Sequence, residues 1–237
     1  MNSLPLGVPV GWLTADGRQV PEDDGWLTPA EQVCLATFQL PWRRADWRLG
    51  RWAAKHAVAA FLGASFEAVE IRPAADGAPE ALLAGDPAPA ALSFSHRAGR
   101  AACAVAPAGT ALGCDLELVE PRSAAFVHDF FTPAERTLVE AAPPEDHPLL
   151  ANLIWSAKES ALKALRAGLR LDTRSVEVRL PPGDEIEGWR PFAVHARETG
   201  GDFAGWWTRD GGWVLTLAAS PPPGLPRPLL DRAPGGA

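Results

Sequence analysis

Cysteine and lysine are scarce in this chain of 237 residues, and long apolar runs are absent. The three cysteines, Cys34, Cys103 and Cys114, form an odd set with no C-x-x-C pair, which argues against a disulfide framework or a zinc site. No apolar run approaches the roughly 18 residues that span a bilayer, and residues 1–10 carry no basic residue of a signal peptide. We therefore expect a cytoplasmic protein that does not interact with a membrane.

The net charge of −7 argues against broad nucleic-acid binding, although a local basic patch could still bind a small phosphate ligand. Of the 22 basic residues, only Lys55, Lys158 and Lys163 are lysines. Arginine hardly gives up its proton, whereas lysine can. Lysine in a chain that otherwise uses arginine is therefore a weak pointer to chemistry, and two of the three fall in one predicted helix.

Three short segments recur in the same order about a hundred residues apart, which indicates an internal duplication. They are T-P-A-E at 28–31 and 132–135, W-x-A-K at 52–55 and 155–158, and V-E-[IV]-R at 69–72 and 176–179. Each T-P-A-E predicts a helix start, because Thr is a good N-cap, Pro fits the first turn and Glu completes a capping box. These residues have a structural role.

The periodicity predicts an α+β fold with two pseudo-symmetric halves, each a long helix packed on a small, mostly antiparallel sheet. An apolar stripe at helical spacing marks a helix over residues 149–167. Alternating patterns predict strands at 91–95, 101–106, 112–118, 176–180, 192–196 and 213–217.

A turn at residues 107–109 divides the chain into an N-terminal half, 1–108, and a C-terminal half, 109–219. We expect a cleft between them. The Pro- and Gly-rich residues 220–237 predict a tail, and the irregular residues 76–89 predict a loop. Because the duplication is internal, a monomer is the simpler expectation.

Two acidic residues share one face of a predicted strand. In the run 112–118 the apolar residues point one way, so Asp115 and Glu117 point the other way, about 7 Å apart. Such a pair suits magnesium, which takes one or two carboxylates and completes its shell with phosphate oxygens and water. Taken alone, the pair could equally be an ordinary solvated face.

The predicted helix adds a third carboxylate. Glu159 and Lys163 are neighbours one turn apart on its polar arc, opposite the apolar stripe. They could form an ordinary surface ion pair. Alternatively, Glu159 is a further metal ligand beside a cation that stabilises or protonates a leaving phosphate.

These residues together resemble a known family. The runs are S-F-S-H at 93–96, G-C-D-L-E at 113–117, F-F-T-P-A-E at 130–135 and W-S-A-K-E-S-A-L-K at 155–163. Their order and spacing are similar to those of the Sfp-type 4'-phosphopantetheinyl transferases. The resemblance covers residues 93–169 well, and the pair of pseudo-symmetric halves agrees with the fold of that family.

The resemblance implies transfer of the 4'-phosphopantetheine arm of coenzyme A to a serine of an apo acyl or peptidyl carrier protein, with release of 3',5'-ADP. Mg²⁺ would be held by Asp115, Glu117 and Glu159. Glu159 or a metal-bound water would take the serine proton, and Lys163 would stabilise or protonate the leaving phosphate. The chain length is typical of members that serve polyketide and nonribosomal peptide carriers in secondary metabolism.

The resemblance also implies contacts with coenzyme A. His96, with Ser95, would contact its phosphates from the first half, and Lys158 would lie at the same site. Arg48, with Arg51 beside it, would contact the 3'-phosphate. The lysine that the family often has in the following loop is absent, since residue 78 is alanine. In the duplication, His56 stands where Glu159 stands, so only the second half keeps the metal ligand.

Two other functions remain open from the sequence. The same three carboxylates could support a magnesium-dependent hydrolase of a nucleotide diphosphate. A module that recognises carrier proteins without chemistry is the third possibility. In the leading interpretation, the apolar segment 126–138 would receive a helix of the carrier protein.

Overall fold

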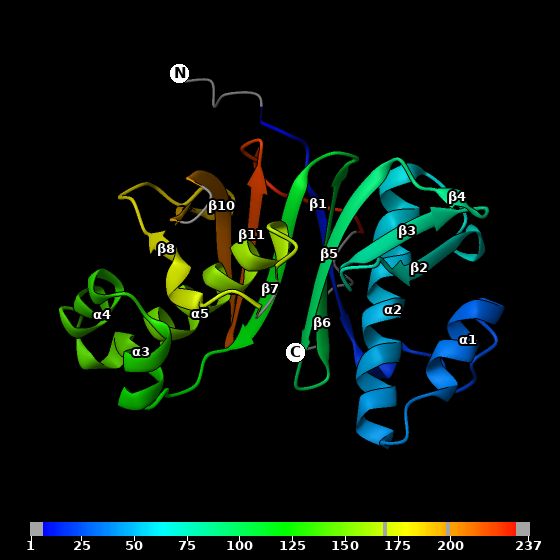
Figure 1. The fold of residues 1–237 in the computed structure, drawn as a ribbon, viewed down its shortest axis with the longest axis horizontal. Coiled ribbons are helices and arrows are strands. Elements are labelled where there is room, and N and C mark those ends of the chain that lie inside the picture. Colours follow the sequence, from blue (N-terminus) through cyan, green and yellow to red (C-terminus); the bar gives the residue numbers. More distant parts are fainter. Residues whose placement is uncertain (1–6, 168–169, 198–199, 231–237) are drawn as a thin grey trace.

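The computed structural model describes residues 7–167, 170–197 and 200–230. It contains two α+β halves side by side, each with a long helix packed on a sheet (Figure 1). Every pairing between neighbouring strands is antiparallel except one. The predicted fold class is therefore confirmed.

The N-terminal half has a four-stranded sheet in the order β12-β1-β6-β5. Its helices are α1 (Pro29–Ala36) and α2 (Pro41–Leu62), and α2 packs across β1, β5 and β6. Beside α2 lies a smaller sheet in the order β2-β3-β4. The strands of this half are β1 (Gly11–Asp16), β2 (Val69–Pro73), β3 (Pro79–Leu83), β4 (Asp86–Pro87), β5 (Ala90–Arg97) and β6 (Arg100–Pro107).

The C-terminal half has a five-stranded sheet in the order β7-β11-β10-β9-β8, covered by α5 (His147–Ala164). Two short helices, α3 (Ala124–Phe130) and α4 (Pro133–Glu140), connect β7 to α5. The predicted helix at 149–167 corresponds to α5. The strands are β7 (Ala111–Leu118), β8 (Val176–Arg179), β9 (Arg190–Ala196), β10 (Gly201–Asp210) and β11 (Trp213–Ser220).

The apolar core has three parts. One lies under α2, one lies under α5, and the third lies between the two sheets. The apolar residues of β7, Leu112, Cys114 and Leu116, belong to the part between the sheets. Asp115 and Glu117 therefore point the other way, towards α5, as the alternation predicted.

The duplication is visible as the same buried ion pair in both halves. Lys55 on α2 lies 3.2 Å from Glu31, and Lys158 on α5 lies 2.8 Å from Glu135. Each glutamate also completes the capping box of its helix and accepts a backbone N–H from the first strand after the long helix. The repeated T-P-A-E and W-x-A-K segments thus meet in space and join three elements of each half.

The C-terminal segment differs from the predicted tail. After β11, the described residues 221–230 return to the N-terminal half, where β12 (Arg227–Pro228) pairs in parallel with Gly11 and Trp12 of β1. Trp206 on β10 donates its indole N–H to the Pro223 carbonyl. Residues 231–237 lie outside the described part.

The predicted boundary between the halves, at residues 108 and 109, lies in the turn from β6 to β7. The predicted loop at 76–89 is wrong, because it contains β3 and β4. β3 has no β-branched residue and is held by pairing with β2. In the described part of the chain, no helix is long and apolar enough to cross a bilayer.

Candidate functional site

Side chains from both halves form hydrogen bonds with the Asp115 carboxylate on β7. Ser95 on β5 donates a hydrogen bond of 2.9 Å to its Oδ1, and the Lys163 ammonium on α5 donates a second one of 2.7 Å. The other oxygen, Oδ2, is buried and has no hydrogen-bond partner among the described residues. A buried acceptor without a donor is costly, so this oxygen is suited to a cation.

Glu159 lies one helical turn before Lys163 and, like Asp115, has one oxygen that lacks a donor. Its Oε1 is buried without a hydrogen-bond partner in the described part of the chain. Burial first, and then the nearby Asp115 and Glu117 carboxylates, raise the pKa of Glu159 to about 7 against the opposing effect of Lys163. Lys163 pairs with Asp115 at 2.7 Å, so the structure does not favour the alternative of an ordinary surface pair between Glu159 and Lys163.

Lys163 is the cation of this group. Burial alone would lower its pKa, but the Asp115 carboxylate to which it is hydrogen-bonded, together with Glu159, raises the pKa above the ordinary value of lysine. Lys163 also donates to the Cys114 carbonyl at 3.0 Å. It stays protonated at neutral pH and acts as a fixed positive charge at the junction of the halves.

Glu117 is more fully engaged than the other two carboxylates. Its Oε1 accepts from the Trp155 indole N–H at 3.0 Å, and its Oε2 accepts from Arg122 at 3.1 Å. Burial, and then the charge of Asp115, raise its pKa, while Arg122 and Arg97 oppose the shift. Both oxygens of Glu117 thus already have donors.

The carboxylates of this group form a partial donor set for a metal ion. Among the residues described, no three His, Cys, Asp or Glu side chains already surround a point that could hold an ion. However, Asp115 and Glu159 each keep one orphaned buried oxygen. Two carboxylates fit the needs of magnesium, which completes its shell with substrate phosphate and water. A direct role for Glu117 requires that it release a hydrogen bond from Trp155 or Arg122.

His96 lies on β5, next to Ser95 and against α2. A Cβ atom on Gly50 would lie 2.9 Å from Phe94 and 3.6 Å from His96, so this glycine allows α2 to approach the strand closely. Partial burial lowers the pKa of His96. Asp46 opposes this shift and Lys163 reinforces it. His96 is therefore mainly neutral at pH 7 and close enough to Lys163 to sense its charge.

The prediction for Lys158 is corrected by its contacts. The side chain is 0% exposed and donates to the carbonyls of Thr173 and Val176 as well as pairing with Glu135. All three ammonium protons therefore have acceptors inside the C-terminal core. Lys158 is a structural residue and does not reach the cleft.

The prediction for Arg48 is also corrected. Gly50 faces β5, and Arg48, two residues earlier on α2, faces the opposite way. Its guanidinium donates to the carbonyls of Pro21, Glu22 and Asp23 and pairs with Asp24 at 2.9 Å. Arg48 holds the loop before α1 instead of lining the cleft.

Arg51 lies on α2 between the face that packs on β5 and the opposite face that carries Arg48. It is 8% exposed, and its guanidinium stacks on Trp47 at 4.5 Å and on Phe94 at 5.7 Å. Burial lowers its pKa, which Glu31 partly offsets. Its Nε has no hydrogen-bond partner among the described residues. Arg51 thus supports Phe94 from behind and keeps an unused donor.

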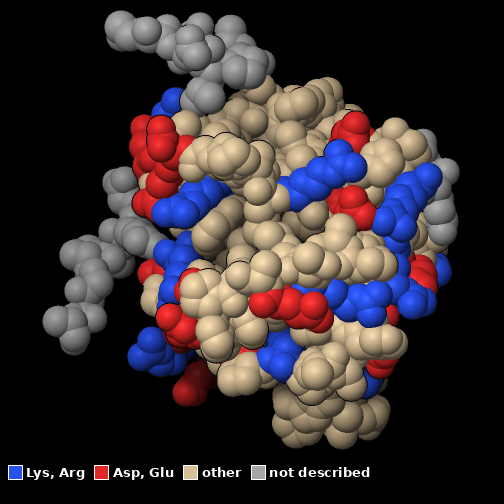
Figure 2. All heavy atoms as spheres, turned by 90° about the vertical axis from the view of Figure 1, so that its left-hand side faces the viewer, with Lys and Arg blue, Asp and Glu red and all other residues tan. Residues whose placement is uncertain are grey.

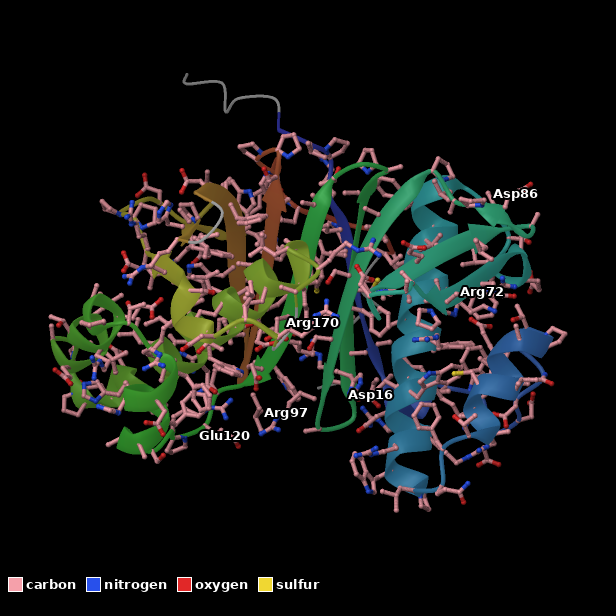
Figure 3. The ribbon with its side chains drawn as sticks, viewed as in Figure 1. Asp16, Arg72, Asp86, Arg97, Glu120 and Arg170 are labelled. Carbon is pink, nitrogen blue, oxygen red and sulfur yellow. The ribbon has the colours of Figure 1, made fainter. Side chains whose placement is uncertain are left out.

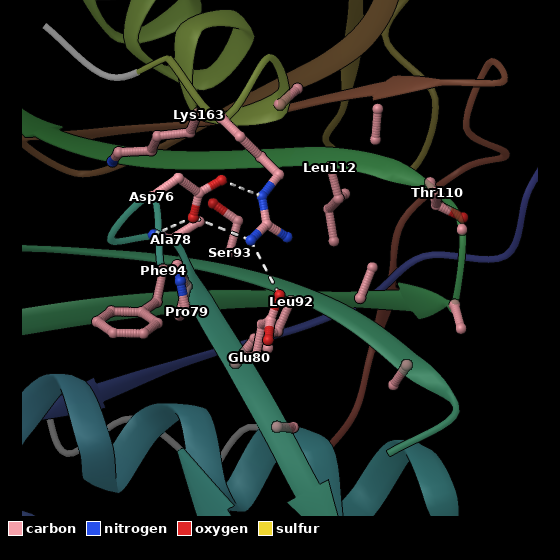
Figure 4. Close-up of a pocket in the computed structure, with 18 of the residues that line it drawn as sticks. Asp76, Ala78, Pro79, Glu80, Leu92, Ser93, Phe94, Thr110, Leu112 and Lys163 are labelled. Carbon is pink, nitrogen blue, oxygen red and sulfur yellow. Dashed lines mark hydrogen bonds and ion pairs between the residues drawn. The ribbon is translucent and has the colours of Figure 1, made fainter. Parts of the chain in front are cut away.

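A cleft of about 980 Å³ opens beside Lys163 between the halves (Figure 4). Small apolar residues of β5 and of the segment before it line one side, while Lys163, Arg166 and Arg170 lie on the other. Arg166 bridges the opening through ion pairs to Asp76 at 2.6 Å and to Glu80 at 2.9 Å. The cleft expected between the halves is therefore present, with its cations supplied by the end of α5.

Several contacts of the site could not be read from the residue pattern. Arg97 and Glu120 pair at 2.6 Å and lie next to each other at the lower end of β5 and β7 (Figure 3). Arg122 joins Glu117 to Asn152, which is fully buried. The nearest signal was the placement of Asn152 on the polar arc of the helix, since that arc faces the site.

Comparison with known proteins gives a match to the C-terminal half. Residues 111–217 match the model of the 4'-phosphopantetheinyl transferase superfamily. Asp115, Glu117, Glu159 and Lys163 all lie inside the matched region, so the C-terminal half resembles that superfamily.

One solved structure that matches is the holo-[acyl-carrier-protein] synthase of Thermotoga maritima. It is 25% identical, with a TM-score of 0.35, over 54% of this chain and 76% of that chain. No curated protein matches the chain.

Proposed function

We propose that this protein is an Sfp-type 4'-phosphopantetheinyl transferase that moves the phosphopantetheine arm of coenzyme A to a serine of an apo acyl or peptidyl carrier protein. The observation that carries the proposal is the buried group of Asp115, Glu159 and Lys163, which lies within the region that matches the superfamily. The presence of two similar halves in one chain supports the Sfp-type assignment, because each half repeats the same buried lysine–glutamate pair.

In the proposed reaction, the serine oxygen attacks the phosphorus that carries the pantetheine arm. The bond from this phosphorus to the bridging oxygen breaks, and 3',5'-ADP leaves. Lys163 remains an ammonium and stabilises the charge on the leaving phosphate. Glu159 would accept the serine proton. The pKa of about 7 that burial and the neighbouring carboxylates give Glu159 applies to the site without Mg²⁺.

Asp115 and Glu159 would hold Mg²⁺ with their orphaned oxygens, and Glu117 adds a third negative charge nearby. When bound, the ion neutralises the diphosphate of the donor and polarises the phosphoryl group. Ser95 fixes the orientation of Asp115 through its hydrogen bond. His96, whose pKa the charge of Lys163 helps to lower, would contact the donor phosphates from the N-terminal half.

The adjoining cleft would receive the rest of coenzyme A. Its volume of about 980 Å³ falls in the range of small-molecule sites, and its wall combines an apolar surface with arginine and lysine. Residue 78, where the family often has lysine, is an alanine of this wall. Arg166 and Arg170 place positive charge at the same opening instead.

The carrier protein would dock beside the cleft on the C-terminal half. Phe130 on α3 and Leu138 on α4 are exposed apolar side chains of this half, at 37% and 38%. Acidic and basic side chains are interspersed on its outer face (Figure 2). An apolar contact within a mixed rim is typical of a transient protein interface.

The decisive experiment is the intact mass of a panel of apo acyl and peptidyl carrier proteins after incubation with coenzyme A, magnesium and this protein. We expect a gain equal to one phosphopantetheine on at least one carrier, together with stoichiometric 3',5'-ADP. The gain should disappear with EDTA and with the variant Glu159→Gln.

The two alternatives give different results in the same experiment. A hydrolase would consume coenzyme A while the carrier mass stays unchanged. A binding module would retain the carrier and leave both molecules intact, also with Glu159→Gln. No mass gain on any carrier would contradict the proposal.

A further inference from the structure

Three buried hydroxyl groups form a closed hydrogen-bonded cluster beneath the acidic site. Thr216 on β11 bonds to the Ser156 hydroxyl at 2.9 Å and to the Ser160 hydroxyl at 2.7 Å. Ser160 also donates to the Thr216 carbonyl at 3.1 Å. All three residues are 0% exposed. We call Ser156, Ser160 and Thr216 the hydroxyl cluster.

The hydroxyl cluster connects α5 to the strand beside Asp115. Thr216 is the cross-strand partner of Asp115, so the two side chains lie on the same face of the sheet. Ser156 and Ser160 lie on the same side of α5 as Glu159 and Lys163. The position of the hydroxyl cluster therefore determines where Glu159 and Lys163 stand relative to Asp115.

The contact between α5 and β7 is unusually close at this point. A Cβ atom on Gly113 would overlap the Ser160 carbonyl and lie 3.0 Å from the Ala164 nitrogen. The helix backbone thus rests directly on the strand. Such a contact leaves little freedom along the helix axis, and the hydroxyl cluster selects one position by its hydrogen bonds.

The N-terminal half shows that the fold does not need these hydroxyls. The corresponding packing of α2 on β1 and β6 uses Leu13, Ala15, Ala101, Cys103 and Val105 from the strands. The duplication places Ala53 and Ala57 of α2 where α5 has Ser156 and Ser160, and both alanines are 0% exposed. The half without the carboxylates therefore has alanine at both positions where α5 has a serine of the hydroxyl cluster.

We propose that Thr216, acting through Ser156 and Ser160, is a positioning residue that sets α5 at the register in which Glu159 and Lys163 face Asp115. This inference rests on the proposed function for its activity measurement. A directional hydrogen bond fixes a register, whereas an apolar contact tolerates sliding. The hydroxyl cluster therefore lies in the half in which the register of α5 positions the acidic site.

The experiment compares Thr216→Val, which removes the hydroxyl at similar volume, with Thr216→Ser, which keeps it. Two quantities are measured: kcat for carrier modification and the magnesium concentration that gives half of the full thermal stabilisation. For Thr216→Val we expect kcat to fall roughly 10- to 100-fold and this concentration to rise about tenfold or more. Thr216→Ser should stay within about threefold of the wild type in both.

A matched control separates positioning from general stability. Val194 on β9 is buried in the part of the core under α5, and β10 separates its strand from the β11 strand that carries Thr216. Val194→Ala should lower Tm by several degrees while leaving kcat and the magnesium response unchanged. If Thr216→Val behaves like Val194→Ala, the inference is wrong.

Further outcomes are also decisive. If Thr216→Val fails to fold, Ser156→Ala and Ser160→Ala each remove one bond and should show the same changes to a smaller degree; normal values in both would overturn the inference. If the wild type is stabilised by magnesium but modifies no carrier, the proposed function fails. The magnesium response of Thr216→Val still decides the inference in that case.

Discussion

The three acidic residues at the junction of the halves differ in their hydrogen-bond partners and therefore in the cost of their negative charge. Asp115 accepts hydrogen bonds from Lys163 and Ser95, and Glu117 accepts them from Arg122 and Trp155. The Oε1 of Glu159 has no hydrogen-bond partner among the described residues. Glu159 consequently bears the largest cost of burial, which its pKa of about 7 reflects. Its ionised form is the part of the site that a cation would stabilise most.

This cost predicts a pH dependence of stability without magnesium. Because the folded state raises the pKa of Glu159 from 4.5 to about 7, the unfolded chain releases this proton first. The contribution of Glu159 to the free energy of unfolding, measured as the difference between the wild type and Glu159→Gln, should therefore fall as pH rises from about 4.5 to about 7 and then level off. At pH 8 in EDTA, Glu159→Gln should be more stable than the wild type by about 1–3 kcal/mol in urea titrations.

The control for this measurement is Glu145→Gln, at an exposed position between α4 and α5. It should leave the pH profile unchanged. Added magnesium should reverse the order, because it stabilises the wild type and leaves Glu159→Gln nearly unaffected. Equal profiles for the wild type and Glu159→Gln in EDTA would contradict the assignment.

Gly113 offers a steric test of the contact between α5 and β7. Gly113→Ala should lower the free energy of unfolding by at least about 2–3 kcal/mol, since the new methyl group would overlap the Ser160 carbonyl. Gly212→Ala is the matched control, because its Cβ would meet only Leu118 at an ordinary 3.7 Å. Chemical denaturation of both variants checks the difference, and similar values would show that α5 can shift without cost.

At the scale of residues, the sequence predicted correctly which face of the strand carries the acidic side chains. Alternation along one strand and spacing along one helix were enough to place Asp115 and Glu117 towards the helix that carries Glu159 and Lys163. Arg48 and Lys158 were misplaced. Their partners are backbone carbonyls and a glutamate from distant segments, which no local pattern reveals.

At the scale of elements, the two buried lysine–glutamate pairs connect the capping box, the long helix and the following strand. A buried pair of this kind is strongly destabilising when one partner is removed, because a charge is left uncompensated. Its repetition explains why T-P-A-E and W-x-A-K recur together in the sequence. Two of the three lysines, Lys55 and Lys158, belong to these pairs.

These pairs give a prediction that separates structure from catalysis. Lys158→Met should lower the free energy of unfolding by about 3–5 kcal/mol, and the folded fraction should keep its kcat. Lys55→Met, the equivalent change in the other half, is the matched control and should cost a similar amount. Thermal unfolding with activity corrected for the folded fraction checks this. A specific loss of kcat in Lys158→Met alone would restore Lys158 to the site.

The two long helices and the strands β5 to β9 and β11 were predicted from sequence, whereas β1 to β4, β10 and β12 were not. β10 (Gly201–Asp210) carries glycines and aspartates at positions where strands usually have branched residues, and it is stabilised by β9 and β11 on either side. β12 has only two residues, one of them proline. Such strands arise from pairing with neighbours, so the sheet must be known before they can be seen.

At the scale of the whole molecule, the site belongs to neither half alone. Ser95 reaches Asp115 from the first half, Ser93 accepts the backbone N–H of Cys114, and Arg97 pairs with Glu120. The third part of the core fixes the two sheets against each other. The duplication therefore produced two similar scaffolds, of which one carries the carboxylates and the other supplies their supports.

The return of the chain to the first half predicts the result of shortening it. Removal of residues 221–237 should lower Tm by several degrees, since β1 loses its parallel partner and Trp206 loses the Pro223 carbonyl. Removal of residues 231–237 alone is the control that gives the reference Tm. Differential scanning calorimetry of the two shortened chains checks the prediction, and equal Tm values would contradict it.

The same segment matters for contacts between molecules. β1 stands between β6 and β12, so the described residues 224–229 cover backbone groups of β1 and of the residues before it that would otherwise face solvent. An uncovered strand edge is a template on which another chain can add a strand. We infer that β12 keeps another chain from pairing with β1. We therefore expect the chain that lacks residues 221–237 to aggregate at concentrations at which the full chain remains dispersed.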